Sequence, residues 1–178
     1  DMFLASAITL ALLGFALAHA APDQRPWQRR LGFVALALFC GVAVLAKGPV
    51  GLLLPGLVIL AFWALKGRFI QGLRRTPWLA LVGLFLGVAA PWYGLATQAN
   101  GMEFLGRFLG FSNLERFTSV LYDHPGPPWF YLPWLLLLLL PWSLFLPVAI
   151  VRLRFWRLES WRQPDADPAA DLPLLALL

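Results

Sequence analysis

The amino-acid sequence predicts an all-α polytopic membrane protein. Of its 178 residues, 60% are hydrophobic and only 13% are charged, whereas soluble domains carry about 25% charged residues. Several apolar stretches approach the roughly 20 residues that a helix needs to cross a bilayer. The net charge of +5 fits the same class, because Lys and Arg collect in the cytoplasmic loops of membrane proteins. These observations favour a transmembrane helix bundle over a protein that binds nucleic acid.

Apolar runs along the chain are predicted to be membrane spans of one transmembrane domain that includes all of residues 1–178. The spans are approximately residues 3–20, 31–46, 50–65, 78–95 and 129–151, and another starts at 172. Only the sequence AKGP separates the second span from the third. Because Gly48-Pro49 is an effective helix break, these two short spans are expected to form a hairpin.

Two further features concern packing and the chain ends. Gly83 and Gly87 stand four residues apart in the fourth span, a spacing that favours close helix packing. Asp1 is followed directly by an apolar run without a basic region, so this run is not interpreted as a signal peptide. The apolar run from residue 172 is too short to cross a bilayer. We therefore expect the chain to be an internal segment of a longer protein.

The basic residues orient the spans. Eleven of the 14 Lys and Arg residues fall in the loops 21–30, 66–77 and 152–162. Two spans separate each of these loops from the next, so all three can lie on the cytoplasmic side. The remaining basic residues then lie on the outer side, together with an outer loop over residues 96–128: Lys47, Arg107 and Arg116.

The outer loop combines an amphipathic stretch with a cluster of ionisable groups. Glu103 and Arg107 stand four residues apart, with apolar residues around them at helical spacing. This pattern predicts a helix that lies in the membrane interface. Further along, SNLERFTSVLYDHPGPPWFYLPW (112–134) places several ionisable residues directly before an apolar run.

Lys47, Arg116 and His124 are the candidate ligands of a phosphate group on the outer face. Arg binds phosphate oxygens in a bidentate manner, and the charge of His responds to a nearby phosphate. Lys47 lies in a tight turn between two short spans, and ionisable groups below the membrane surface tend to be functional. A lipid phosphate is the natural anion at that depth. Three further residues are expected to support this site: Glu115, Asp123 and Tyr131.

Other interpretations of these residues stay open. Lys47 can extend its side chain to the interface, and Arg116 and His124 can act as interfacial anchors beside aromatic residues. Arg107 can be a solvated charge. His19 is interpreted as a helix-end residue.

No cofactor and no metal site are predicted. The sequence has no P-loop pattern and no HExxH motif. A divalent cation held by His124 and nearby carboxylates stays an open alternative. Cys40 is the single cysteine, so it supports neither a disulfide within the chain nor a Cys-based metal site.

Two segments resemble the bacterial protein-mannosyltransferase-like glycosyltransferases, the group that includes the aminoarabinose transferases acting on lipid A. LAKGPVGLLLP (45–55) resembles the Lys-Gly segment of that family. NLERF, a following His, and PPWFYLP (113–133) resemble its Arg-Phe…His…Pro-Phe-Trp-Tyr-Tyr-x-Pro segment. LLPWSLFLP (139–147) and DMFLASAITLAL (1–12) extend the resemblance over most of the chain. Phe111-Ser112-Asn113 departs from the Glu-His of the aminoarabinose transferases, which favours a generic member of the family.

This resemblance implies a GT-C fold, a bundle of transmembrane helices with short helices in the outer loops. It also implies transfer of a sugar from a polyprenyl-phosphate donor to a lipid, glycan or protein acceptor, at the periplasmic face of the bacterial inner membrane. Lys47 and Arg116 would bind the donor phosphate, with His124 beside it, and would stabilise the charge that grows on the leaving phosphate. The acidic catalytic residue of the family lies upstream of Asp1, so we expect this chain to be inactive alone.

Two alternative functions stay open. A carrier or flippase for polyprenyl-phosphate sugars would have a similar phosphate-binding cluster without the chemistry, and a non-catalytic membrane subunit would use its outer charges only as anchors. A flippase is expected to carry ionisable residues or broken helices near the middle of the membrane. Apart from prolines such as Pro55 and Pro141, the spans have no such feature.

Overall fold

The computed structural model describes residues 2–22, 24–103, 131–138, 140, 142–153 and 171. These residues form helices and turns, with no strand among them. In chain order the helices are α1 (Met2–Ala20), α2 (Pro26–Lys47), α3 (Val50–Leu65), α4 (Phe69–Arg75), α5 (Trp78–Asn100), α8 (Tyr131–Leu138), the 3-10 helix η3 (Trp142–Phe145) and α9 (Leu146–Leu153). Helices α1, α2 and α5 are long and apolar enough to cross a membrane, and α3 is a shorter apolar helix.

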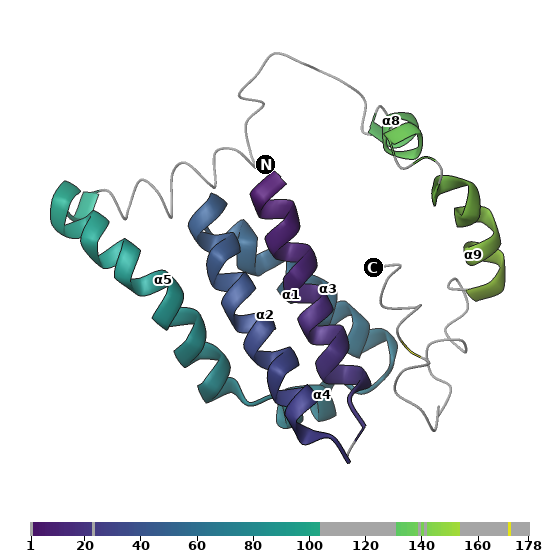
Figure 1. Ribbon diagram of the computed structural model, residues 1–178, viewed down its shortest axis with the longest axis horizontal. Coiled ribbons are helices and arrows are strands. Elements are labelled where there is room, and N and C mark those ends of the chain that lie inside the picture. The colour runs from purple at the N-terminus through teal and green to yellow at the C-terminus, as the bar shows by residue number, and fades with distance from the viewer. Residues whose placement is uncertain are drawn as a thin grey trace.

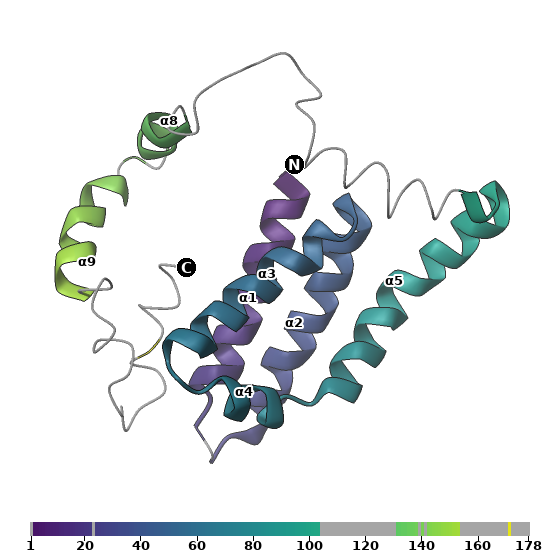
Figure 2. The same ribbon diagram turned by 180° about the vertical axis from the view of Figure 1, so that it is seen from behind.

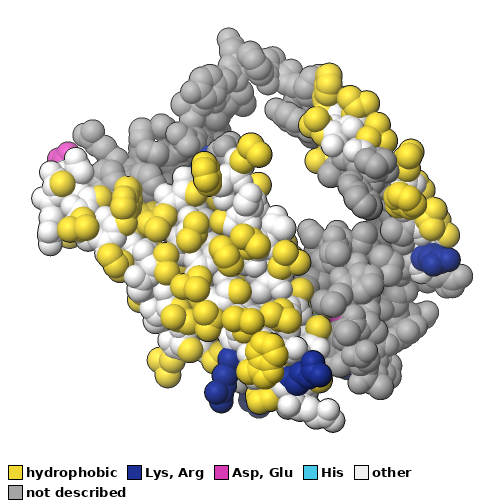
Figure 3. All heavy atoms as spheres, in the orientation of Figure 1, with side chains coloured by type: hydrophobic (Ala, Val, Ile, Leu, Met, Phe, Trp, Pro, Cys, Tyr) yellow, Lys and Arg dark blue, Asp and Glu magenta, His cyan; other side chains and the backbone are white. Residues whose placement is uncertain are grey.

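The chain runs back and forth between two ends of a helix bundle, named here the outer and the inner end. Helix α2 packs against α1, α3 and α5, and the turn between α2 and α3 lies at the outer end (Figure 1). The connection from α1 to α2 and the short helix α4 lie at the inner end, which both views show (Figure 2). The basic loops 21–30 and 66–77 therefore share one end of the bundle. Figure 3 shows dark blue Lys and Arg side chains there, below a surface rich in hydrophobic side chains.

Glycines allow α1 and α2 to approach each other closely. A Cβ atom on Gly14 would lie 2.7 Å from the backbone nitrogen of Leu36, and one on Gly32 would lie 2.5 Å from that of Ala18. Such small residues let helix backbones meet in a membrane, where lipid tails are as apolar as the side chains. Around this contact, α1, α2, α3 and α5 bury a common core: Ala11, Phe15, Leu36, Ala37, Cys40, Ile59, Phe62, Trp63 and Leu81.

Among the described residues, no close helix contact forms at the glycine pair in α5. No atom of the described residues lies within 4 Å of a Cβ built on Gly83 or Gly87. Helix α5 instead presents a larger side chain to a glycine of α2, since a Cβ on Gly41 would lie 2.9 Å from the Cβ of Val88. The small residue at this interface therefore belongs to α2.

Helix bounds differ from the expected spans in three places, one of which is the end of α5, which lies at Asn100 in place of residue 95. Helix α2 begins at Pro26 and has 22 residues, because proline is favoured in the first turn and polar residues such as Arg29 can reach the interface from there. In place of one span over 129–151, the described residues form α8, η3 and α9. Position 141 is a proline, which lacks the N–H needed to continue helical hydrogen bonding. The interfacial helix expected in the outer loop falls largely on residues 104–128, outside the described residues.

Candidate functional site

The turn between α2 and α3 positions Lys47, the last residue of α2. Gly48 follows with φ 79° and ψ −152°, a backbone region that is essentially restricted to glycine. Its N–H donates a hydrogen bond to the carbonyl oxygen of Val44 at 2.7 Å, which closes the end of α2. Pro49 has the helical φ of −55° and precedes the first turn of α3. The sequence Lys-Gly-Pro therefore ends one helix and starts the next without a longer loop.

Two contacts hold this turn against the rest of the bundle. A Cβ atom on Gly51 would lie 2.3 Å from the backbone carbon of Ala43, so α3 starts in direct contact with α2. From α5, the hydroxyl of Tyr93 donates a hydrogen bond to the carbonyl oxygen of Val44 at 3.2 Å. Lys47 is half-buried at this position, and its backbone is fixed from both sides.

Of the three predicted phosphate ligands, Lys47 lies in the part of the chain that the structure describes. Arg116 and His124 lie outside the described residues, and so do Glu115 and Asp123. Tyr131 begins α8, and only its backbone is described. The described residues contain no group of three or more His, Cys, Asp or Glu side chains that could hold a metal ion.

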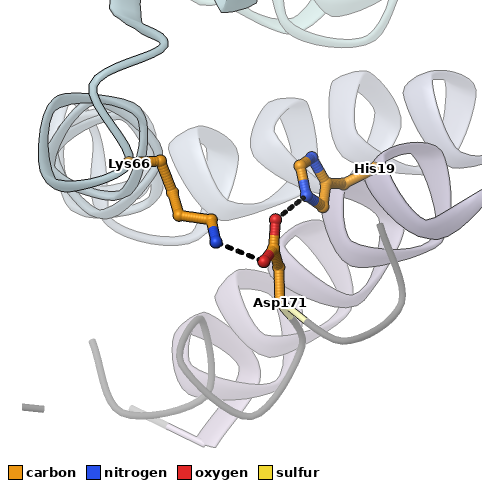
Figure 4. A network of polar contacts seen from close by, with 3 residues as sticks. All are labelled: His19, Lys66 and Asp171. Atoms are coloured by element: carbon orange, nitrogen blue, oxygen red, sulfur yellow. Dashed lines mark hydrogen bonds and ion pairs between the residues drawn. The ribbon is translucent and has the colours of Figure 1, made fainter. Parts of the chain in front are cut away.

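A second polar site lies at the inner end, formed by His19, Lys66 and Asp171 and named here the inner triad (Figure 4). Asp171 Oδ2 lies 3.1 Å from His19 Nε2, and its Oδ1 forms an ion pair with Lys66 Nζ. The side chains of Lys66 and Asp171 are 3% and 2% exposed. The His19 ring also packs edge-on against the Phe62 ring, with centroids 5.1 Å apart.

The inner triad keeps Asp171 ionised despite its burial. Burial by itself raises the pKa of this carboxyl, but hydrogen bonds and charge from Lys66 and His19 outweigh it and lower the pKa below its usual value of 3.8. The buried charges of Lys66 and Asp171 therefore form an ion pair with each other, and a buried charge is stable only when it is paired. The triad lies at the opposite end of the bundle from Lys47, which indicates a structural role in joining residue 171 to α1 and α3.

Sequence reasoning missed this triad. It interpreted His19 as a helix-end residue and placed Lys66 in a basic loop. One signal was present: all three residues adjoin the predicted inner ends of apolar runs. Residues at a shared membrane depth can meet, but the pairing itself depends on how the helices pack.

Known proteins resemble this chain over nearly its whole length. It is 34% identical over 158 residues to the undecaprenyl phosphate-alpha-4-amino-4-deoxy-L-arabinose arabinosyl transferase of Shewanella sediminis, a match that covers 88% of this chain and 27% of the relative. It is 33% identical over 171 residues to the transferase of the same name from Pseudomonas paraeruginosa, covering 96% of this chain and 29% of the relative. No protein-family model matches the chain.

A solved structure has the same fold. The crystal structure of ArnT from Cupriavidus metallidurans bound to undecaprenyl phosphate matches with a TM-score of 0.72 and 26% identity, covering 97% of this chain and 34% of that one. This likeness confirms the predicted fold class, an all-α membrane helix bundle of the GT-C type. The chain spans less than a third of the length of the curated relatives it matches.

We expect Gly48→Ala to destabilise the protein by about 1–3 kcal/mol, because an L side chain is strained in this backbone region. The measurement is the thermal unfolding midpoint of the full-length protein in detergent. Gly56→Ala is the matched control: it lies inside α3, and a Cβ there would meet no atom of the described residues within 4 Å. Equal midpoints for the two variants would contradict the strain assigned to Gly48.

We expect Asp171→Asn to lower the free energy of unfolding by about 3–5 kcal/mol, because it leaves the buried Lys66 ammonium without its counter-charge. The double variant Lys66→Met/Asp171→Leu removes both charges and should recover most of this stability. Thermal unfolding in detergent measures both, with the exposed Arg152→Gln as a control. An Asn variant as stable as the parent protein would show that the ion pair contributes nothing.

The stability from Asp171 should depend on pH in one direction. Because its pKa is lowered on folding, the contribution is fully present above the usual Asp pKa and is lost as pH falls through the lowered pKa. The difference in stability between the parent protein and Asp171→Asn should therefore shrink progressively as the pH falls below about 5. Unfolding midpoints of both proteins across this range measure the effect, and a difference that stays constant would refute it.

Proposed function

The chain is a relative of the undecaprenyl phosphate-aminoarabinose arabinosyl transferases, and we propose that it forms part of a membrane glycosyltransferase with a polyprenyl-phosphate sugar donor. The observation that carries the proposal is the Lys47-Gly48-Pro49 turn, which holds a half-buried cation at the outer end of the bundle. The names of the relatives support the class of donor, and the ArnT crystal structure contains undecaprenyl phosphate.

Lys47, Arg116 and His124 together would bind the donor phosphate. In the reaction, the bond between the anomeric carbon and the phosphate oxygen breaks, and the polyprenyl phosphate leaves with the electron pair. A nucleophilic group of the acceptor forms the new bond and gives its proton to a general base, which we place outside this chain. The cations stabilise the negative charge that develops on the leaving phosphate, and so bind the transition state more strongly than the ground state.

The local structure suits Lys47 to this role. Its backbone is fixed by the Gly48 N–H bond to Val44 and by the contact of Gly51 with Ala43. A preorganised cation needs no reorganisation when charge develops, and this is what makes such stabilisation effective.

We also propose that the outer end faces the periplasm and that the membrane is the bacterial inner membrane. The basic loops 21–30 and 66–77 lie together at the inner end, which is the cytoplasmic side by the positive-inside rule. The acceptor would then be a lipid, glycan or protein at the periplasmic face. Phe111-Ser112-Asn113 favours an acceptor or sugar that differs in detail from those of the aminoarabinose transferases.

We expect Lys47→Met and Arg116→Ala to lower the rate of sugar transfer. Arg116→Ala should cost about 2–4 kcal/mol of transition-state stabilisation, which corresponds to about 30- to 900-fold in kcat. The assay follows transfer from an undecaprenyl-phosphate sugar by the full-length protein reconstituted in vesicles. Arg30→Gln is the control, because it removes an exposed cation at the inner end.

Binding of undecaprenyl phosphate, measured beside sugar transfer in the parent protein and in the same variants, distinguishes the candidate functions. Full transfer activity in Arg116→Ala and Lys47→Met would refute the roles assigned to them. A parent protein that binds the donor but transfers no sugar would favour a carrier over an enzyme. A parent protein that neither binds nor transfers would favour a non-catalytic subunit.

A further inference from the structure

An arginine-lined cavity of about 500 Å³ lies at the inner end of the bundle, between the α1–α2 connection and α4. Arg29, Arg68 and Arg75 line it, and no carboxylate stands among its described lining residues. The guanidinium of Arg29 donates a hydrogen bond to the carbonyl oxygen of Ala21 at 3.5 Å. Asp171, the nearby acid, is already paired within the inner triad. Arg68 and Arg75 therefore give the cavity a positive wall at the end of the bundle where the basic loops gather.

The placement of α4 gives this wall a defined shape. Gly72 packs directly against the indole of Trp63, since a Cβ on Gly72 would lie 2.5 Å from the ring. The backbone N–H of Arg68 donates to the carbonyl oxygen of Trp63 at 3.0 Å. At the other end of α4, the hydroxyl of Thr76 donates to the carbonyl oxygen of Gly72 at 2.8 Å. These contacts hold Arg68 and Arg75 at the cavity from the two ends of one short helix.

A second cavity of about 360 Å³ adjoins the first and is apolar. The two cavities share four lining residues: Phe15, Phe33, Trp63 and Thr76. From this common wall the apolar cavity extends between α2, α3 and α5, past Ile59, Gly56 and Phe85. An arginine-lined cavity and a hydrocarbon-lined cavity thus lie next to each other inside the bundle, with these four side chains between them.

We propose that the two adjoining cavities hold one anionic phospholipid, with its phosphate at the arginines and one acyl chain in the apolar cavity. The guanidinium group of an arginine binds phosphate through two parallel hydrogen bonds. Basic pockets between transmembrane helices on the cytoplasmic side bind anionic lipid head groups. The volume of the arginine-lined cavity falls in the range of about 300–1,000 Å³ that is usual for ligand sites. A free phosphate would use only the arginines, whereas a phospholipid uses both compartments.

This lipid site is separate from the donor site proposed at Lys47. The two lie at opposite ends of the bundle, so loss of one need not impair the other. The bound lipid would fill the space under α4 and fasten the loop 66–77 to the membrane. The arginines of the site require a lipid head group with a net negative charge, which phosphatidylglycerol has and phosphatidylcholine lacks.

The test is retention of phosphatidylglycerol by the full-length protein reconstituted with equal amounts of phosphatidylglycerol and phosphatidylcholine, measured by native mass spectrometry. Arg75→Gln should lower the affinity for phosphatidylglycerol about fivefold, and Arg68→Gln/Arg75→Gln about 25-fold, at roughly fivefold for each arginine near the lipid surface. Arg74→Gln is the matched control for charge near the lipid surface: it removes the same charge from the same helix and lines a neighbouring cavity with Arg68 and Arg75, but it does not line the arginine-lined cavity. The loss of phosphatidylglycerol in Arg75→Gln should therefore exceed the loss in Arg74→Gln.

Gly56→Leu tests the apolar compartment. A Cβ at this position meets no atom of the described residues within 4 Å, and a leucine side chain would occupy the apolar cavity. Phosphatidylglycerol should therefore be lost while the unfolding midpoint is kept. Preference for phosphatidylglycerol that falls further in Arg75→Gln and Gly56→Leu than in Arg74→Gln would support the site. Equal retention in all variants would overturn it. If inorganic phosphate displaces the lipid and the Gly56→Leu variant still binds inorganic phosphate, the arginines hold a free anion and not a lipid phosphate.

Discussion

The cost of placing a charge in hydrocarbon governs this structure. A charged side chain at the centre of a membrane helix costs at least about 2.5–3.5 kcal/mol. Accordingly, α1, α3 and α5 contain no Lys, Arg, Asp or Glu, and α2 carries its charges in its first two turns and at its last residue, Lys47. The direction of each helix then determines which charges can meet. Lys47 is brought to one end, and the basic residues of the loops are brought to the other.

Glycine contacts supply the packing that such a bundle needs. Hydrophobic side chains gain little by leaving lipid for protein, so close approach of helix backbones must contribute to association. Gly14 and Gly32 provide it between α1 and α2, and Gly51 provides it between α2 and α3. The same Gly51 contact supports the turn that carries Lys47. Packing and the candidate site are therefore linked through one residue.

The two ends of the bundle present positive charge by different means. At the outer end, a glycine-only backbone conformation and a proline hold a single lysine on a short turn. At the inner end, α4 carries arginines on a helix that packs on Trp63, while the inner triad neutralises the neighbouring Lys66. The outer arrangement suits charge that changes during a reaction, since its backbone is fixed in advance. The inner arrangement suits a permanent anion at the membrane surface, which is why we assign it a lipid.

Local properties of the sequence determined the fold class, the helix hairpin at Gly48-Pro49 and the end of the bundle at which Lys47 lies. Apolar run length, helix-breaking residues and the distribution of basic residues are each readable without knowing which helices touch. The phosphate-binding roles of Lys47, Arg116 and His124 stay predictions from the same reasoning, and only the place of Lys47 falls within the described residues. Only the tertiary structure decided that Asp171 pairs with Lys66 and with His19, which precedes it by 152 residues. It also decided that, among the described residues, Gly14 and Gly32 form a close helix contact while Gly83 and Gly87 meet no atom within 4 Å. The rotation of each helix, set by all its neighbours together, determines which face meets another helix.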